Sequence, residues 1–209
     1  MKILSCDPGL SGGISRFIDG AIQYIGLMPT IRVEVLSKIE QFDLKNGKKQ
    51  FIKSGPNKGK PKMKLRRAAK YKEVLDMPRI YSLMQNVDVI VIEAQSCRPG
   101  NGSAQCASTM TNYGRLLGVA EVANNLYGSK LVIANPASWK TDMHITMDKD
   151  EKKACGSASL VTLALKAKAC ALAKKLFPKY EFKTPKGKLL DGLCESTLIG
   201  QWYINKGNK

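Results

Sequence analysis

The chain has 209 residues, enough for one domain of ordinary size, and 44% of them are hydrophobic, which excludes general disorder. Its 34 lysine and arginine residues outnumber its 17 aspartate and glutamate residues, so the formal net charge is +17. No apolar run approaches the roughly 18 residues that span a bilayer, and the N-terminal MKILSCDPG lacks the pattern of a signal peptide. We therefore expect a cytoplasmic protein without a membrane partner.

The first part of the chain is expected to begin with three antiparallel strands. Met1–Cys6 is an apolar run that ends at a D-P-G turn. Gly12–Ile18 and Ala21–Leu27 are joined by a D-G pair, which is a strong hairpin signal. Ile31–Leu44 fits either a strand or a helix. Leu65–Gln85 has the apolar spacing of a helix, with a bend at its proline.

Strands and helices alternate in the rest of the chain. Val87–Ile92, with the sequence VDVIVI, has the composition of a central strand that is covered on both faces. Ser103–Leu126 is expected to be a helix and Lys130–Ala134 another buried strand. Two further helices are expected over Ser159–Phe177 and Leu189–Ile204. This order predicts an α/β fold, with a sheet flanked by helices.

Six cysteines are present, none of them in a C-x-x-C pair, and there is one histidine. This composition is poor material for a zinc site. Most of the cysteines lie among apolar or small residues, so we expect free, buried thiols in a reducing compartment.

The basic residues are unevenly distributed. Lys45–Lys72 holds twelve lysine and arginine residues and no acid, and its glycines and prolines indicate a loop or hairpin. A second basic cluster runs over Lys149–Lys179. Together they indicate a polyanionic partner, most simply nucleic acid, with a merely solvated surface as the alternative. The residues expected to contact nucleic acid are Lys58, Lys60, Lys62, Lys64, Arg66, Arg67, Arg98 and Lys168.

Two acidic residues follow apolar strands directly. Asp7 ends the first strand, and Glu93 ends the VDVIVI strand. Both are therefore expected at the carboxyl ends of neighbouring strands, where α/β sheets form their binding crevice. A turn with the following Pro-Gly is the alternative for Asp7, and an ordinary surface position is the alternative for Glu93.

Two more acids open the last helix. Asp191 and Glu195 are four residues apart, so they share one helix face with Cβ atoms about 6 Å apart. Compensation of the helix dipole is the alternative role. Four carboxylates near a basic groove suit hard divalent cations, Mg²⁺ first and Mn²⁺ as a second possibility. Two such ions would activate water and stabilise the leaving oxygen in phosphodiester cleavage.

These motifs resemble those of the RuvC-type Holliday-junction resolvases of the RNase H-like superfamily, especially forms from phages. The matching segments occur in the family order and extend from Met1 to about Tyr203; they are ILSCDPGLSGGI, VDVIVIEAQ, NGSAQCASTMTNYGRLLGV, VIANPASWK and DGLCESTLIGQW. The resemblance implies one RNase H-like nuclease domain over residues 1–209, with its first three strands antiparallel. It also implies insertions at about 45–64, which is basic, and at about 142–160.

The resemblance further implies a homodimer that nicks four-way DNA junctions in pairs and depends on Mg²⁺. The metal ligands that it implies are Asp7, Glu93, Asp191 and Glu195. Lys140 and Lys166 match basic residues near the scissile phosphate, with Lys168 as a near alternative to Lys166. Asp191 precedes Glu195 by four residues, whereas cellular resolvases have three. The aromatic wedge that follows IE-x-Q in cellular enzymes is missing, and Tyr113 is either its substitute or a core residue.

Two other functions remain open at this stage. One is a broader nuclease of the same fold that cuts branched DNA or RNA–DNA hybrids. The other is a catalytically inactive nucleic-acid-binding homologue, which would have no reason to keep four acids. A dimer face is expected on the small-residue helix Ser103–Leu126.

Overall fold

The computed structural model describes residues 1–42, 44–45, 48–96, 103–184 and 186–207, with the side chains at 36–42, 44–45, 64–69 and 103–105 left undescribed. The chain divides into two compact units. The first unit combines Met1–Thr30 with Leu75–Lys209, and the second consists of Ile31–Val74.

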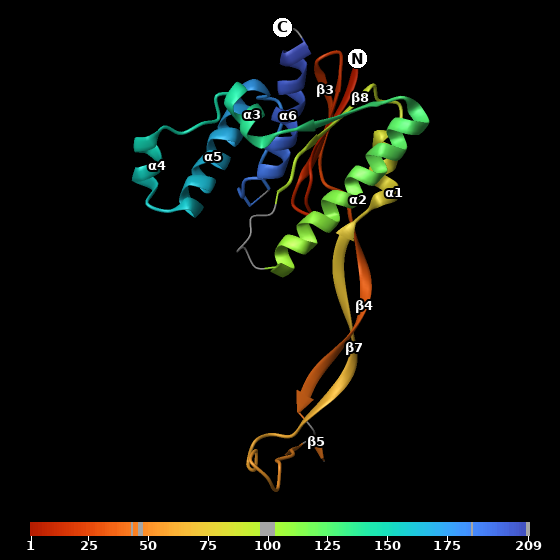
Figure 1. The fold of residues 1–209 in the computed structure, drawn as a ribbon, viewed down its shortest axis with the longest axis vertical. Coiled ribbons are helices and arrows are strands. Elements are labelled where there is room, and N and C mark those ends of the chain that lie inside the picture. Colours follow the sequence, from red (N-terminus) through yellow and green to blue (C-terminus); the bar gives the residue numbers. More distant parts are fainter. Residues whose placement is uncertain (43, 46–47, 97–102, 185, 208–209) are drawn as a thin grey trace. The chain divides into compact units, whose positions relative to one another are not determined.

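The first unit contains a five-stranded mixed sheet of order β3-β2-β1-β8-β9 (Figure 1). β1 (Lys2–Asp7), β2 (Gly13–Ile18) and β3 (Ala21–Leu27) are antiparallel neighbours, which confirms the prediction of three antiparallel strands. β8 (Val89–Glu93) runs parallel to β1, and β9 (Lys130–Ala134) runs parallel to β8. This is the mixed sheet, with its first three strands antiparallel, that the sequence motifs imply.

The β2–β3 hairpin turns at the predicted D-G pair. Asp19 and Gly20 both have positive φ values, 49° and 81°. Two consecutive left-handed residues form a type I′ turn, whose twist matches that of the flanking strands. The amino group of Met1 pairs with the Asp19 carboxylate, and this ion pair holds the first residue against the turn.

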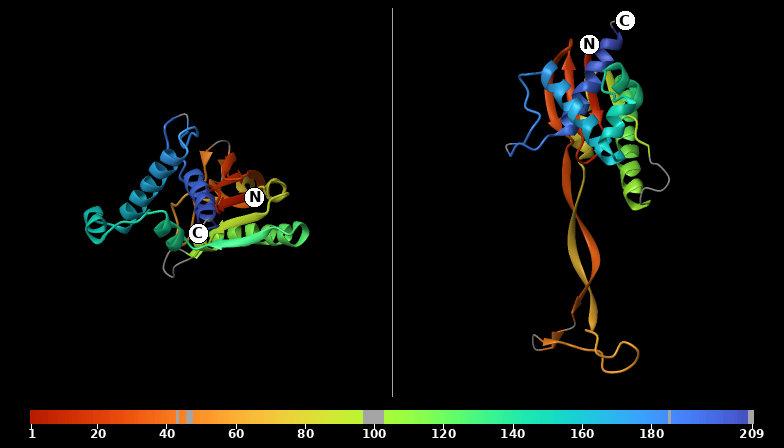
Figure 2. Two further views of the ribbon diagram at one scale, coloured as in Figure 1. Left: turned by 90° about the horizontal axis from the view of Figure 1, so that it is seen from above. Right: turned by 90° about the vertical axis from the view of Figure 1, so that its left-hand side faces the viewer.

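Helices cover both faces of the sheet (Figure 2). Alternate residues of β1 and β8 point to opposite faces, so Ile3 and Val91 enter one core and Leu4 and Ile90 enter the other. The first core is closed by α3, α5 and α6, and the second by α1 and α2. The bounds of these helices are Met77–Met84 (α1), Ser103–Tyr127 (α2), Pro136–Asp142 (α3), Ala158–Leu176 (α5) and Asp191–Gly207 (α6).

The predicted helices Ser103–Leu126, Ser159–Phe177 and Leu189–Ile204 are confirmed within a few residues. The structure adds two helices of seven residues, α3 and α4 (Lys149–Cys155), which the sequence analysis did not predict. Tyr113 of α2 packs, partly buried, against the second core.

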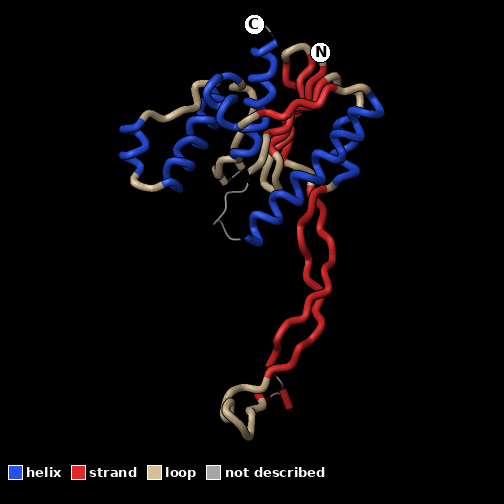
Figure 3. The backbone as a smooth tube through the Cα atoms, viewed as in Figure 1, coloured by secondary structure: helices blue, strands red, loops and turns tan. Residues whose placement is uncertain are grey.

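The second unit is a long antiparallel ribbon, in which β4 (Thr30–Phe42) pairs with β7 (Met63–Leu75) (Figure 3). A short pair, β5 (Leu44–Lys45) with β6 (Lys48–Lys49), lies beyond it. Phe51 and Pro61 form an antiparallel bridge that joins the two ends of the loop between them.

The helix predicted over Leu65–Gln85 is wrong in its first half, because residues up to Leu75 form strand β7. The alanines, leucine and lysines there favour a helix on their own, but pairing with β4 supplies backbone hydrogen bonds that override this weak preference. The proline marks the start of α1 rather than a bend. Asp76 caps this helix by accepting from the Arg79 N–H at 3.2 Å.

The cysteines differ in state. Cys6, Cys170 and Cys194 are buried free thiols, and burial raises the pKa of Cys6 to about 12. Cys106 is disulfide-bonded, so the expectation of free thiols is wrong at this position. That expectation depended on the apolar and small residues around the cysteines, whereas a disulfide depends on two Cβ atoms lying about 3.5–4.5 Å apart in space.

Within the described part of the chain, no single helix is long and apolar enough to cross a membrane. Only α4 and α5 taken together reach that length and composition, and the chain bends by 118° between them.

Candidate metal centre

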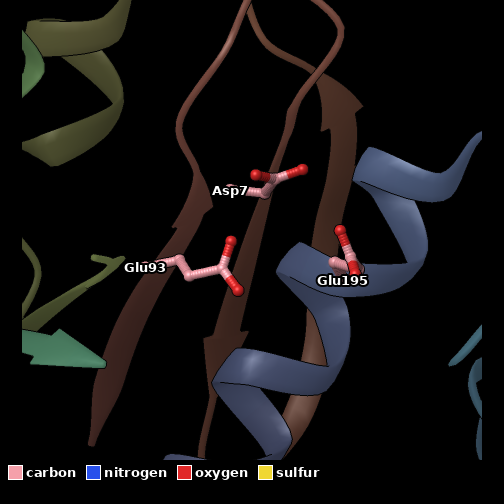
Figure 4. A group of neighbouring side chains, drawn as sticks. All are labelled: Asp7, Glu93 and Glu195. Atoms are coloured by element: carbon pink, nitrogen blue, oxygen red, sulfur yellow. The ribbon is translucent and has the colours of Figure 1, made fainter. Parts of the chain in front are cut away.

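Three carboxylates meet at the carboxyl ends of the inner strands β1 and β8. Asp7 ends β1 and Glu93 ends β8, and these strands are parallel neighbours, so their carboxyl ends lie side by side. Glu195 comes from the second turn of α6. One oxygen from each of Asp7, Glu93 and Glu195 lies within 4.8 Å of the others (Figure 4).

Glycine brings α6 to these strand ends. The backbones of Gly12 and Gly192 form a parallel bridge between the start of β2 and the start of α6. A Cβ atom on Gly192 would lie 2.4 Å from the carbonyl oxygen of Ser11, a distance that real Cβ atoms do not show. Only glycine therefore allows the first turn of α6 to touch the loop that follows Asp7.

Buried hydroxyl groups fix the rotation of α6. Ser5 Oγ donates to the carbonyl oxygen of Ser196 at 2.7 Å. Ser15 Oγ lies 3.1 Å from Ser196 Oγ and 2.9 Å from Thr197 Oγ1, and all four residues are fully buried. Because each hydroxyl finds a partner, these polar groups can be buried next to the apolar core. The network holds Glu195, the neighbour of Ser196, towards Asp7.

The electrostatics of the group favour a cation. Burial, and then the negative charges of Glu195 and Glu93, raise the pKa of Asp7 well above its usual range. Burial is also the main cause that raises the pKa of Glu93, against the effect of Lys140. Ionised carboxylates this close in a low dielectric repel each other. An all-oxygen set of this kind fits Mg²⁺ or Mn²⁺, the hard cations that prefer carboxylate ligands.

Lys140 is a cation that contacts two of these acids. Its Nζ lies 2.8 Å from Glu195 Oε1 and 3.8 Å from Glu93 Oε1. It belongs to α3, which follows β9, the strand next to β8. The structure thus brings Lys140 to the same cluster as Asp7, Glu93 and Glu195.

Asp191 and Lys166 form a separate pair beside the cluster. The Lys166 ammonium group of α5 donates to the Asp191 carboxylate, and this hydrogen bond raises the pKa of Lys166. The three-acid group does not include Asp191, although it lies one helical turn before Glu195. Its role as a ligand remains a prediction.

Two residues that sequence reasoning did not assign to the site contact Glu93. The indole N–H of Trp139 donates to Glu93 Oε1 at 2.9 Å, and the Gln95 amide donates to Oε2 at 3.4 Å. Both stand in motifs that the sequence displays, W-K after N-P-A-S and Q after I-E-A. Gln95 lies two residues after the strand-end acid Glu93, and this closeness was a signal that could have found it, whereas Trp139 lies 46 residues from Glu93 and gave no such signal.

The expected nucleic-acid contacts lie mainly in the second unit. Lys58, Lys60 and Lys62 are exposed in its terminal loop, with Lys60 Nζ 3.0 Å from Asn57 Oδ1. Lys168 instead joins α5 to α4, with Nζ 2.6 Å from Glu151 Oε1. Lys64, Arg66 and Arg67 belong to β7 with undescribed side chains, and Arg98 lies outside the described residues.

Comparison with known proteins finds similarity to solved structures at low sequence identity. No protein-family model and no curated protein matches the chain. Thermus thermophilus RuvC in complex with a Holliday junction substrate is 12% identical, with a TM-score of 0.46, and the match covers 99% of this chain and 97% of that one. Fowlpox virus resolvase in complex with Holliday junction DNA is 13% identical, with a TM-score of 0.41, and the match covers all of both chains.

Proposed function

We propose that this protein is a divalent-metal-dependent endonuclease that resolves four-way DNA junctions by paired nicking. The observation that carries the proposal is the meeting of Asp7, Glu93 and Glu195 at the carboxyl ends of β1 and β8, in a chain of net charge +17. A basic protein attracts a polyanion, while carboxylates alone would repel the phosphate that they must approach. A cation held by the three acids resolves this conflict.

The three acids are proposed to hold the metal, with Asp191 as a further ligand. When bound, divalent ions supply an activated water and stabilise the leaving oxygen of a phosphodiester. Lys140 and Lys166 now neutralise carboxylates. With a divalent cation held by the acids, both lysines would be free to contact a phosphate, where they would stabilise the charge that develops in the transition state.

The second unit is proposed to hold a junction arm. It carries fourteen basic and four acidic residues, a net charge of +10 out of the chain's +17. A two-stranded ribbon fits the major groove of duplex DNA, and lysines on a loop bind phosphates irrespective of sequence. We therefore propose recognition of DNA shape by this unit, together with Arg98 and Lys168.

Paired nicking needs two active sites, and hence a homodimer. We propose that α2 forms the dimer face, because Gly114 and Gly118 are exposed there with open space around their Cα atoms. Small residues permit two helices to approach closely. Size-exclusion chromatography with and without a four-way junction tests this part, and elution as a monomer in both cases would contradict it.

Cleavage of a labelled four-way junction tests the function as a whole. We expect cutting in Mg²⁺ or Mn²⁺, and none in excess chelator. Ca²⁺ should inhibit cutting while DNA binding persists, because it binds the same oxygens at longer and less regular distances.

The same assay separates the alternatives. Full activity in chelator would contradict the metal site. Equal cutting of linear duplex, RNA–DNA hybrid and junction would favour the broader nuclease, and junction binding without cutting in any metal would favour an inactive binding protein.

Replacing Lys58, Lys60, Lys62 and Lys64 by glutamine should weaken junction binding and flatten its salt dependence. For each lysine that binds a phosphate, its replacement should lower the slope of log K against log salt by about 0.9 on duplex DNA. The single-turnover cutting rate at saturating protein should remain near normal, since the carboxylates lie in the other unit. Binding titrations between about 50 and 200 mM salt measure the slope.

A double variant, Lys2→Gln with Lys130→Gln, is the matched control. These lysines are the first residues of β1 and β9, at the opposite ends of the strands from the acids. Their replacement should leave the slope near that of the wild type. An unchanged slope in the fourfold variant would identify the loop as merely solvated. A collapse of the saturated rate would mean that the loop acts in catalysis.

A further inference from the structure

One turn of α3 contacts two of the three acids. The indole N–H of Trp139 donates to Glu93 Oε1, and the adjacent Lys140 reaches Glu195. The Lys140 ammonium group also lies 5.0 Å from the centre of the Trp139 ring, within cation–π range. This short helix is therefore built against the carboxylates, although it supplies none of them.

The chain fixes this turn firmly. The Ala94 N–H donates to the carbonyl oxygen of Ala134 at 2.8 Å, which joins the residue after β8 to the last residue of β9. Asn135 then caps α3 by accepting from the Ala137 and Ser138 N–H groups at 2.9 and 3.3 Å. Proline follows the cap directly, with a φ angle suited to the first helical position. The direction of Trp139 towards Glu93 is set by these backbone contacts.

The contact itself is suited to holding a carboxylate. Trp139 is fully buried, so its ring has no freedom to swing away from Glu93. An indole N–H can only donate and an ionised carboxylate can only accept, so the hydrogen bond runs in one direction only, from Trp139 to Glu93. With Oε1 held by Trp139 and Oε2 3.4 Å from the Gln95 amide, rotation of the carboxylate is restricted. A rigid ligand loses less entropy when a metal binds.

We propose that Trp139 is a positioning residue that orients the Glu93 carboxylate for divalent cation binding. This inference deepens the proposed function and rests on it. Partners of this kind, which hold a ligand without touching the metal, typically change metal affinity by about 10- to 100-fold when they are removed. Trp139 would act through Glu93 alone and would not contact the substrate.

Mn²⁺ binding to the full-length protein without DNA, measured by calorimetry or electron paramagnetic resonance, tests the proposal. Trp139→Phe removes the N–H and keeps an aromatic ring, and it should weaken Mn²⁺ binding about tenfold. Replacement of Trp139 by benzothienylalanine, which has sulfur in place of the N–H, should do the same with almost no change of shape. Mn²⁺ affinity within twofold of the wild type in both variants would overturn the proposal.

Trp202→Phe is the matched control. The Trp202 indole N–H donates to Asp142 Oδ2 at 2.7 Å, so this variant also removes an indole–carboxylate hydrogen bond, here a partly buried one away from the three acids. Its Mn²⁺ affinity should equal that of the wild type. An equal loss in both tryptophan variants would overturn the proposal, because it would show a general loss of packing.

A double-variant cycle separates positioning from structure. In a Glu93→Ala background, Trp139→Phe should have no further effect on Mn²⁺ affinity, because no carboxylate remains for it to orient. A further tenfold loss in that background would overturn the proposal. Absence of Mn²⁺ binding in the wild-type protein would instead overturn the proposed function, and this inference with it.

Discussion

Replacement of Asp7 by asparagine should lower junction cleavage about a thousandfold or more, while junction binding stays the same or tightens. The substitution keeps the shape of the side chain but removes a charged ligand from a cluster whose oxygens lie within 4.8 Å of one another. Loss of metal stabilisation of several kcal/mol corresponds to this factor. Binding should persist because the change also removes a negative charge that repels phosphate. Single-turnover cleavage and gel-shift titrations measure the two effects.

Glu93→Gln and Glu195→Gln should behave in the same way. Asp191→Asn should lower junction cleavage less, because the Asp191 carboxylate pairs with Lys166 beside the three-acid group. Asp150→Asn, at an exposed position in the first turn of α4, is the control for an Asp-to-Asn change and should cut normally. Normal cutting by Glu195→Gln would contradict the metal site and leave this acid as a dipole partner of the helix.

The same Asp7→Asn variant should be more stable than the wild type when no metal is present. The folded protein raises the pKa of Asp7 by burial and by the charges of Glu195 and Glu93, so ionised Asp7 opposes folding at neutral pH. Thermal melts should therefore give asparagine the higher Tm. The difference should shrink as the pH falls through the raised pKa of Asp7, since the wild-type carboxyl is then protonated. A lower Tm for Asp7→Asn at pH 7 would contradict this account.

The sequence predicts the sheet of the first unit well because its signals are local. The apolar runs of β1 and β8 end at Asp7 and Glu93, and the D-G pair turns with two left-handed residues, as such pairs do. The strand β7 is different. Its composition favours a helix, and only its pairing with β4, about thirty residues earlier, makes it a strand. Such pairing between segments is not visible in a single sequence.

The candidate site is predictable to a similar depth. Strand ends point to Asp7 and Glu93, and helical spacing points to Glu195 and Asp191. Spacing cannot say which of the two helix acids faces the strands, because this depends on how α6 is rotated. The rotation is set by contacts of Ser196 and Gly192 with residues near the start of the chain. The indole contact of Trp139 with Glu93 likewise needs the β8–β9 pairing to bring them together.

Gly192→Ala should destabilise the first unit and abolish junction cleavage, although the residue has no side chain of its own. The added methyl group would lie 2.4 Å from the Ser11 carbonyl oxygen and 2.7 Å from the Gly12 Cα atom. Both are backbone atoms of the loop after Asp7, so no flexible side chain can yield. Overpacking of this kind costs about 1–3 kcal/mol, and it would move α6 away from the sheet and Glu195 away from Asp7. Chemical denaturation measures the loss of stability, a junction-cleavage assay measures the loss of activity, and Mn²⁺ titration measures the loss of metal binding that accompanies it.

Gly207→Ala is the matched control for this last prediction. Gly207 is the last residue of the same helix, α6, but a Cβ atom there would meet no atom within 4 Å. Alanine should therefore leave the stability of the protein equal or slightly higher, through its higher helix propensity, and leave metal binding unchanged. The different outcomes of the two Gly-to-Ala changes separate the effect of close backbone approach from that of helix propensity. If Gly192→Ala also stabilised the protein and bound Mn²⁺ normally, the contact between α6 and the loop after Asp7 would not be what positions Glu195.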